Sequence, residues 1–406
     1  YLGIDIGSTS TKAVITDTAG EPLAGLYTRT SGRPLEAVQS IFEAIDNISL
    51  TYNCSFMFHG AGTTGSGRKF IGSIINADMA LDEITAHARA AYMIDPAVDT
   101  IIEIGGQDAK FTTMKNGTVT FSIMNNVCAA GTGSFVEEQA KKLGCPLSEY
   151  SALAEGVDAP LSSDRCTVFM ERDLNHYLSE GFSRREVLAS VLHSVRENYL
   201  TKVAIEKNIG GRIFFQGATA KNRALVAAFE QRLGKPIMVS KYCHLTGALG
   251  VALSLMDSGV TESSFRGIHL YKESIPVRSE VCGLCTNSCK IKVAEVDGGP
   301  AAFGFLCGRD YETKRFVNQN SSGFDLIKER GKVLHTKRRV DAKFDFSVGI
   351  PAALHLFDEV PLWREFFANR GIKTVVSDNL KDGVKRGKGM AGAEFCAPMS
   401  ELHGHV

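Results

Sequence analysis

The sequence predicts an α/β protein: a domain built on a duplicated strand–turn–strand unit, then a small cysteine-rich module and the beginning of another α/β domain. A short apolar strand runs into an acidic, glycine-containing turn and a second strand in residues 1–17, and the same order returns in residues 100–124. Stretches with helical periodicity lie between and after these units. With 44% hydrophobic and 22% charged residues, the 406-residue chain can bury a sizeable core.

Composition and charge narrow the class of protein. The formal net charge is zero, so no global field favours nucleic acid or membrane as a partner. The sequence has no run of 18 apolar residues and no signal peptide, and we expect a cytoplasmic protein. Ten cysteines in such a chain point to reduced thiols or to metal and iron–sulfur ligands rather than disulfides. Because the sequence opens inside an apolar run and stops after a new domain begins, we expect a part of a longer protein.

The first unit combines a carboxylate with a turn rich in hydroxyl groups. Residues 1–4 and 12–16 read as strands, and the turn between them carries Asp5, one glycine and four Ser or Thr residues. A backbone nest with hydroxyl donors suits a phosphate group, and Asp5 at a strand end suits a hydrated Mg²⁺. A plain hairpin is the alternative interpretation of this turn taken alone.

Two further segments precede the second unit. Residues 34–49 have the apolar spacing of an amphipathic helix. Residues 60–68 resemble a phosphate loop superficially but lack the Gly-Lys-Ser/Thr ending of a Walker loop. Residues 80–93 read as a helix with Asp82, Glu83 and His87, which we interpret as a solvated or interdomain face rather than a catalytic set.

The second unit repeats the first. Residues 101–104, 110–114 and 118–123 read as strands, with Gly105-Gly106-Gln107-Asp108 as the first turn and Asn116-Gly117 as a hairpin turn. Two such hairpins that face each other across a cleft can bind the phosphates of one nucleotide from both sides. The pairing is far more specific than either turn alone.

Two cysteines precede predicted helices in similar settings. Cys128 follows an Asn-Asn pair and leads through a glycine-rich turn into a helix over 135–143, and Cys166 also leads towards a helix. The partial positive charge at a helix N-terminus favours a thiolate or another anion. The alternative is a buried cysteine beside a tight turn.

The segments that follow are rich in small residues at two places. Residues 184–208 read as a long amphipathic helix. Residues 213–222 read as a strand, a small-residue turn and a helix start, where a base or ribose could lie against the backbone. Residues 247–253 read as a helix whose small side chains permit close packing, as a hinge requires.

The composition changes after Asp257, and a metal-ligand pattern follows a linker. The spacing Cys-x2-Cys-x3-Cys, with a fourth cysteine across a probable hairpin, is typical of a Cys₄ zinc site or a [4Fe–4S] cluster, and the spacing does not decide between them. The four predicted ligands are Cys282, Cys285, Cys289 and Cys307.

The last part of the sequence predicts a basic connector over 328–343 and then a strand, a helix and a strand over 346–376. Residues 387–392 match G-x-G-x-x-G, but a charged segment precedes them instead of a strand, which argues against a nucleotide site. We interpret Cys396 and His403 as structural rather than as ligands.

Residues 1–256 resemble the activator ATPases of 2-hydroxyacyl-CoA dehydratases and the ATPase subunits of benzoyl-CoA reductases. The matching stretches are residues 3–9, 104–110, 128–133, 166–169 and 247–250. The resemblance implies a duplicated ribonuclease H-like ATPase domain of the actin, Hsp70 and sugar kinase type. Residues 280–406 resemble the segment that follows the activase in long, fused activase-type proteins. The predicted domains are the ATPase domain at 1–257, a linker at 258–279, the cysteine-rich module and connector at 280–340, and the start of a dehydratase-related domain at 341–406.

In that family, two cysteines from each of two subunits hold one [4Fe–4S] cluster at the dimer interface. The resemblance implies Cys128 and Cys166 as these ligands, in a homodimer that couples ATP hydrolysis to low-potential electron transfer. It also implies an iron–sulfur dehydratase or reductase as electron acceptor and ferredoxin or flavodoxin as donor. The family usually has Gly-Gly where this chain has Gly217-Ala218. The added methyl group would weaken or tilt nucleotide binding without abolishing it.

We predict that ATP and Mg²⁺ bind between the two hairpins. Asp5 would organise the hydrated Mg²⁺, and Glu103, Gln107 or Asp108 would orient the attacking water, because phosphoryl transfer depends mostly on positioning and charge stabilisation. The predicted nucleotide-binding residues are Gly7, Ser8, Thr9, Ser10, Thr11, Lys12, Gly105, Gly106, Gly217, Ala218 and Asn222.

Two other functions compete with the activase. One is a phosphotransferase of the same superfamily, such as a sugar or carboxylate kinase with structural zinc. Such an enzyme needs a catalytic base, for which the sequence offers no clear candidate, and it does not need paired cysteines at helix starts. The other is a nucleotide-binding scaffold without turnover.

Overall fold

A computed structural model describes the whole chain except residues 126–130, 285–286, 297–298, 308, 310, 313–325, 335–339, 379 and 391–396. Cys128, Cys285 and Cys396 therefore lie outside the described residues. The chain forms two compact units, Tyr1–Phe316 and Val317–Val406.

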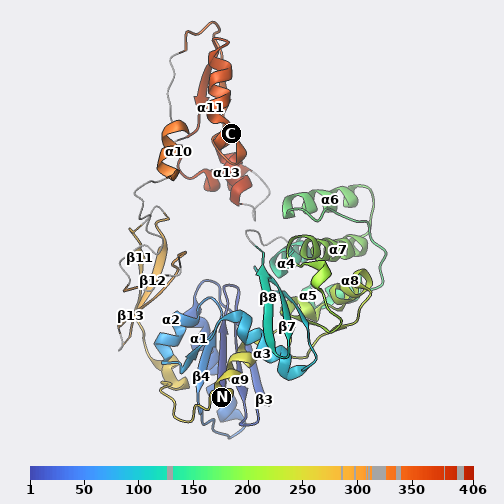
Figure 1. Cartoon of the computed structure of the whole chain (residues 1–406), viewed down its shortest axis with the longest axis vertical. Helices are drawn as coiled ribbons and strands as arrows, with labels where there is room; N and C mark the ends of the chain where they lie inside the picture. The colour runs from blue at the N-terminus through green and yellow to red at the C-terminus, as the bar shows by residue number, and fades with distance from the viewer. Residues whose placement is uncertain are drawn as a thin grey trace. The chain divides into compact units, whose positions relative to one another are not determined.

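The first unit contains two lobes, and a five-stranded sheet forms the first of them (Figure 1). Its strands are β1 (Leu2–Ile6), β2 (Ser10–Thr16), β3 (Pro22–Arg29), β4 (Ala61–Thr64) and β5 (Met79–Ala80). The order is β3-β2-β1-β4-β5, with β1, β2 and β3 antiparallel and β4 and β5 parallel to β1. The helices α1 (Pro34–Thr51) and α2 (Arg68–Ile75) share the sheet's hydrophobic core. The apolar stripe predicted for α1 is buried there, at Leu35, Val38, Ile41, Phe42 and Ile45.

The second lobe repeats this topology. Its strands are β6 (Thr100–Ile104), β7 (Ala109–Lys115), β8 (Thr118–Met124), β9 (Ile213–Gln216) and β10 (Ile237–Met238), in the order β10-β9-β6-β7-β8. As in the first lobe, three antiparallel strands come first along the chain, and the later strands run parallel to the first of them. Asn116 and Gly117 both have positive φ, at 50° and 77°, as a two-residue hairpin turn requires. The predicted duplicated fold is confirmed.

Helices α4 to α8 complete the second lobe (Figure 1). They are α4 (Gly133–Lys142), α5 (Leu147–Ala154), α6 (Thr167–Ser179), α7 (Arg184–Lys202) and α8 (Arg223–Leu233), with the short 3₁₀ helices η1 (Glu206–Asn208) and η2 (Ala218–Lys221). The helix α7 is capped by Ser183 and Glu186 in a capping box, and most of its residues are buried. It ends six residues before the predicted helix does, and η1 follows.

Two helices, α3 (Glu83–Ile94) and α9 (Thr246–Asp257), connect the lobes. The helix α9 packs on β1, β2 and β4, whereas buried residues of α3 pack with those of the second lobe. The two helices touch backbone to backbone, because a Cβ added to Gly250 would lie 1.7 Å from the carbonyl oxygen of Ala86. The close packing predicted for the small-residue helix is present.

Residues 258–279, the predicted linker, include the 3₁₀ helix η3 (Ile268–Lys272), whose Leu270 is buried in the core of the first lobe. A three-stranded antiparallel sheet follows, made of β11 (Val277–Val281), β12 (Lys290–Val296) and β13 (Gly299–Phe303). It packs on α2, where the rings of Phe303 and Phe70 lie 6.0 Å apart.

The second unit has the strand–helix–strand order that the sequence predicts. It contains α10 (Leu326–Leu334), β14 (Ser347–Ile350), α11 (His355–Ala368), β15 (Lys373–Val376), α12 (Gly383–Met390) and α13 (Ala397–His405). The strands β14 and β15 are parallel. Gly387 of α12 serves packing, since a Cβ there would lie 1.6 Å from the carbonyl oxygen of Ser400. Among the described residues of both units, no helix is long and apolar enough to cross a membrane.

Candidate nucleotide site

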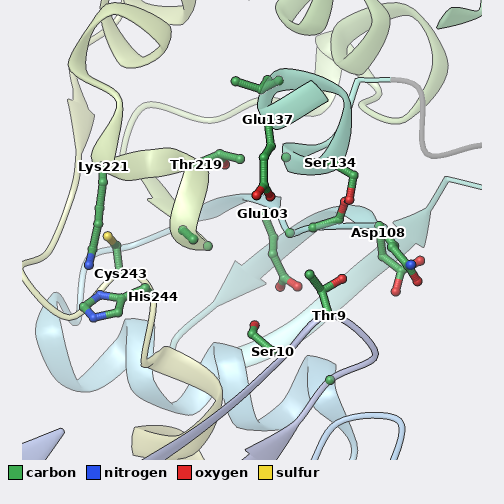
Figure 2. A pocket seen from close by; sticks show the side chains of 18 of the residues that line it. Thr9, Ser10, Glu103, Asp108, Ser134, Glu137, Thr219, Lys221, Cys243 and His244 are labelled. Atoms are coloured by element: carbon green, nitrogen blue, oxygen red, sulfur yellow. The ribbon is translucent and has the colours of Figure 1, made fainter. Parts of the chain in front are cut away.

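A cavity of about 660 Å³ lies between the two lobes and is lined by both repeated hairpins. In Figure 2, Thr9 and Ser10 of the first lobe lie opposite Ser134, Glu137 and Thr219 of the second. Every predicted catalytic residue lines this cavity, and so does every predicted nucleotide-binding residue except Thr11, which is buried. The predicted residues thus come together from strands far apart in the sequence.

The two turns that were predicted to bind phosphate have the same hydrogen bond. The amide of Gly7 donates to the carbonyl of Ser10 at 3.0 Å, and the amide of Gly105 donates to the carbonyl of Asp108 at 2.8 Å. The turns also meet across the cleft, where Ser8 Oγ donates to Gln107 Oε1 at 2.8 Å. The repeat therefore extends from the sheet topology to the geometry of the turns.

Asp5 is the next-to-last residue of β1 and is 4% exposed. Its Oδ2 accepts a hydrogen bond from Lys12 Nζ at 3.1 Å, and Lys12 is its register partner on β2. Burial acts to lower the pKa of Lys12, but the charge of Asp5 and its hydrogen bond raise it. On the parallel side Asp5 is paired with Thr64, and Asp5 Oδ1 has no partner among the described residues. A buried carboxylate oxygen with a free lone pair fits the water shell of Mg²⁺.

Glu103 is at the position in the second lobe that is equivalent to Asp5, but both of its carboxylate oxygens accept hydrogen bonds. Lys110 Nζ donates to Oε1 at 2.8 Å, and Gln216 Nε2 donates to Oε2 at 2.9 Å. Burial opposes ionisation, yet His87, Lys110 and Gln216 lower the pKa of Glu103 to about 2. Glu103 is therefore a fixed anion at the floor of the cavity.

Asp82, Glu83 and His87 have different surroundings. Asp82 caps α3 by accepting a hydrogen bond from the Thr85 amide, whereas Glu83 and His87 line the cavity between the lobes, which agrees with the predicted interdomain face and not with the solvated one. His87 is 8% exposed, and its Nδ1 is 2.9 Å from Thr246 Oγ1 on α9. Its Nε2 is 3.7 Å from Glu103 Oε1. The local sequence could not reveal this face, because it depends on how α3 crosses between the lobes.

Sequence reasoning also missed Lys110 as a site residue. Its Nζ lies 2.8 Å from Glu103 and 3.4 Å from Glu83. Burial acts to lower the pKa of Lys110, but the two carboxylates raise it well above its usual value. A signal was available, because Lys110 follows Glu103 by the same seven positions that separate Lys12 from Asp5.

The predicted ribose and base segment begins at a turn that only glycine fits well. Gly217 has a φ of 96°, and a Cβ there would lie 2.4 Å from the carbonyl oxygen of Ile104. The next residue, Ala218, starts η2 and lines the cavity. Asn222 caps α8, with its Oδ1 accepting from the Leu225 amide at 3.1 Å.

The helix α4 is attached directly to the second turn. The amides of Gly133 and Ser134, at its start, donate to the carbonyls of Gly105 and Gly106 at 2.8 and 2.9 Å. Cys128 lies in the segment 126–130, outside the described residues. Cys166 is the half-buried N-cap residue of α6, as the sequence predicts.

The cysteine-rich module holds two buried thiols at the neck of one loop. The amide of Cys282 donates to the carbonyl of Cys289 at 2.9 Å, which closes the loop after β11. Arg309 Nη2 lies 3.4 Å from Cys282 Sγ, and Cys307 is half-buried. In the described part of the chain, the one group of three or more His, Cys, Asp or Glu with ligand atoms within 4.8 Å of one another is Glu83, His87 and Glu103. Because Cys285 lies outside the described residues, the four-cysteine site stays a prediction.

Comparison with known proteins covers both units. Residues 2–254 match the BadF/BadG/BcrA/BcrD ATPase family, and residues 347–406 match the CoA enzyme activase uncharacterised domain (DUF2229).

Individual relatives match the ATPase part. The (R)-2-hydroxyglutaryl-CoA dehydratase activating ATPase of Acidaminococcus fermentans is 34% identical over 62% of this chain and 95% of its own. The activator of lactoyl-CoA dehydratase from Anaerotignum propionicum is 35% identical with the same coverage. A solved structure, the activator of the 2-hydroxyisocaproyl-CoA dehydratase from Clostridium difficile with bound ADPNP, is 30% identical with a TM-score of 0.56. That match covers 63% of this chain and 94% of the activator.

Proposed function

The chain belongs to the BadF/BadG/BcrA/BcrD ATPase family, and on this premise we propose that it is an ATP-dependent reductive activase. In this proposal a homodimer hydrolyses ATP and delivers low-potential electrons to a partner iron–sulfur enzyme of the CoA-thioester dehydratase or reductase type. The observation that carries the proposal is the attachment of α4 to the turn at Gly105 and Gly106, because it connects a nucleotide cavity to a cysteine-bearing segment.

The cavity supports ATP and Mg²⁺ as ligands. Asp5 offers an unpartnered, buried carboxylate oxygen to the waters around Mg²⁺, and Lys12 offers its ammonium group to phosphate oxygens. Both glycine turns present backbone amides to the phosphates from opposite lobes. The bound ADPNP in the related activator structure supports nucleotide binding at this fold. Among the residues predicted to orient the attacking water, Gln107 accepts a hydrogen bond from Ser8, and Asp108 is exposed at the turn.

We assign Cys128 and Cys166 as the thiolates that each subunit contributes to a shared [4Fe–4S] cluster. Two cysteines per chain cannot complete a four-thiolate site, whereas a two-fold axis presents the same pair twice. The cluster would supply one low-potential electron at a time. Cys166 at the N-cap of α6 favours this role, since the end of the helix stabilises negative charge.

Asn198 on α7 contacts residues that follow Cys128 and residues that precede Cys166 in the sequence. Its Nδ2 donates to the carbonyls of Asp164 and Arg165 at 2.7 and 2.8 Å, immediately before Cys166. The same side chain packs against Gly131, where an added Cβ would lie 2.5 Å from Asn198 Oδ1. One buried amide therefore contacts both the turn that follows Cys128 and the segment that precedes Cys166. This arrangement suits a pair of ligands that must act together.

A change in the bound nucleotide would be transmitted to the cysteines through α4. A change in the cleft angle moves the turn at Gly105 and Gly106, and the start of α4 must follow because it is hydrogen-bonded to that turn. For this to work, the nucleotide must bind the two dimer conformations with different affinity, since equal binding would shift no population. Hydrolysis of ATP would make the electron delivery irreversible.

The proposed electron acceptor is a CoA-thioester dehydratase, because the relatives are activators of such enzymes. We place ferredoxin or flavodoxin as the donor. In the cysteine-rich module we place a structural metal, either zinc or a second [4Fe–4S] cluster, on Cys282, Cys285, Cys289 and Cys307. The Arg309 guanidinium beside Cys282 suits a thiolate ligand, because a cation stabilises the deprotonated sulfur.

The test uses anaerobically purified protein. Iron, sulfide, oligomeric mass and electron transfer to an acceptor are measured with ATP, with ADP and with neither. Cys166→Ala should lose the bridging cluster and electron transfer, whereas Cys54→Ala, at an exposed cysteine, should not. A monomer that retains a full cluster, or transfer rates indifferent to nucleotide, would end this proposal. The phosphotransferase with structural zinc would then become the leading function.

A further inference from the structure

Five carboxylates line the nucleotide cavity, and they differ in how many of their oxygens remain free. They are Asp5, Glu83, Glu103, Asp108 and Glu137. Both oxygens of Glu103 are bound within the protein, and Glu137 is a more exposed side chain whose Oε1 lies 2.5 Å from the exposed Arg29. Asp108 is exposed at the turn, and Asp5 has the place suited to the hydrated cation. Glu83 is the one of these five carboxylates to which no function has been assigned above.

Glu83 is fixed at one oxygen and open at the other. It is the first residue of α3, and its Oε2 lies 3.4 Å from Lys110 Nζ. Within the described part of the chain, Oε1 has no hydrogen-bond partner. The side chain is 31% exposed and borders the cavity, so water can reach it.

We propose that Glu83 is the carboxylate that orients the attacking water in ATP hydrolysis and accepts its proton, with Lys110 holding it in place. This assignment rests on the proposed ATPase function and adds a residue to those that the sequence indicates. Lys110 also binds Glu103 at 2.8 Å, so the fixed anion of the second lobe anchors the lysine that positions Glu83.

The charges around Glu83 favour a proton acceptor. The groups that face it are Lys110 from β7, Glu103 from β6, Asp5 from β1, Lys12 from β2 and His87 from α3. Burial raises the pKa of Glu83, and the negative charges of Glu103 and Asp5 add to this against the opposing effect of Lys110. A carboxylate with a raised pKa takes a proton from water more readily than Glu103, whose pKa is lowered to about 2.

The chemical step is a hydrolysis without change of oxidation state. The water oxygen forms a bond to the γ-phosphorus, and the bond from that phosphorus to the β,γ-bridging oxygen breaks. The water proton passes to Glu83 and then to the released phosphate or to solvent. The products are ADP and inorganic phosphate.

The test compares Glu83→Gln, Glu83→Asp and Asp82→Asn in the full chain. Asp82→Asn is the matched control, because it neutralises the neighbouring carboxylate and asparagine caps a helix as well as aspartate does. Glu83→Gln should lower kcat for ATP hydrolysis by about 100-fold or more, the usual contribution of a general base. The Kd for ADPNP should stay unchanged, and the acid limb of the pH–kcat profile should disappear. Glu83→Asp should retain that limb at a reduced kcat, and Asp82→Asn should match wild type.

Three results would overturn the proposal. The first is a near-normal kcat in Glu83→Gln, and the second is an equal loss of ADPNP affinity and kcat, which would indicate a purely structural role. The third is an acid limb that persists in Glu83→Gln. Binding of ADPNP shows that each variant is folded. If Glu83→Gln does not fold, Glu83→Asp decides through kcat, and a near-normal kcat in that variant would overturn the proposal. A wild-type protein that binds ADPNP but never hydrolyses ATP would overturn the proposed function itself, so the two failures are distinguishable.

Discussion

Lys110 donates a 2.8 Å hydrogen bond to Glu103, and this pair repeats the pairing of Lys12 with Asp5 in the other lobe. In both cases the lysine lies seven residues after the acid and directly opposite it across an antiparallel strand pair. The two acid–lysine pairs face one cavity.

Replacing Asp5 with asparagine removes the charge that faces the predicted Mg²⁺ without changing the size of the side chain. We expect Asp5→Asn to lower ATPase kcat by about 100-fold, because a preorganised charge at a phosphoryl-transfer site contributes at least this much. The melting temperature should change far less. Asp17→Asn is the control, since Asp17 accepts turn amides through an oxygen that asparagine retains. Near-normal turnover in Asp5→Asn would rule out the assignment.

Replacing Lys110 with methionine should destabilise the fold in a pH-dependent way. The pKa of Glu103 is lowered from 4.5 to about 2, so its ionised form stabilises the fold above pH 4.5 and this contribution is lost as the pH falls towards 2. Breaking one side of a buried ion pair costs about 3–5 kcal/mol.

The unfolding free energy of Lys110→Met should therefore lie below that of wild type at pH 7, and the gap should narrow as the pH falls below 4.5. Urea titrations at several pH values measure this gap. Lys115→Met, at the exposed end of the same strand, provides the control. A gap that stays constant from pH 7 to pH 3 would contradict the role of Glu103 as a buried anion that Lys110 stabilises.

The contact between α3 and α9 should not tolerate a methyl group. Gly250→Ala places a Cβ 1.7 Å from the Ala86 carbonyl oxygen, so the two helices must separate. Overpacking of this kind costs about 1–3 kcal/mol, and more where only backbone can move. Thermal unfolding should show a lower Tm than for Gly211→Ala, whose added Cβ meets nothing within 4 Å. Equal melting temperatures would show that the helices adjust freely.

The cysteine-rich module should lose its metal when a ligand is removed. We expect Cys282→Ser to lower zinc or iron per chain and to expose residues 280–310 to protease, because metal binding and folding of a small module are coupled. ATPase activity should survive, since the nucleotide cavity lies in the two lobes. Cys54→Ser, at an exposed cysteine, should retain the metal. Unchanged metal content in Cys282→Ser would contradict the assignment.

Much of the fold could be predicted because its elements are specified locally. The apolar strands of residues 1–17 and 100–124, the Asn116-Gly117 turn and the stripe of α1 all depend on short-range patterns. The cavity residues on the two turns could also be predicted from the sequence, since each turn follows its strand directly. The elements that were missed include the strands β3 and β4 and the helices α2 and α5.

Glu83, His87 and Lys110 were missed as site residues for a different reason. Nothing local distinguishes a polar helical face that meets solvent from one that meets a cavity, and the face that α3 turns to the cavity depends on its packing against α9 and the second lobe. The pairing of Lys110 with Glu103 was available by analogy with the first unit, but only once Lys12 is known to face Asp5. Long-range geometry thus decides which of the predicted polar residues meet.

The lobes share one plan, yet a nucleotide triphosphate has two unlike sides. Asp5 is paired in register with Thr64 and Glu103 with Gln216, at equivalent positions on the parallel strands. The longer glutamine saturates Glu103, whereas Thr64 leaves an oxygen of Asp5 available. The internal symmetry of the cavity is therefore broken at the two acids, because one keeps an open oxygen and the other is fully hydrogen-bonded. Under the proposed function, this difference sets which lobe receives the water shell of Mg²⁺ and so the orientation in which the nucleotide binds.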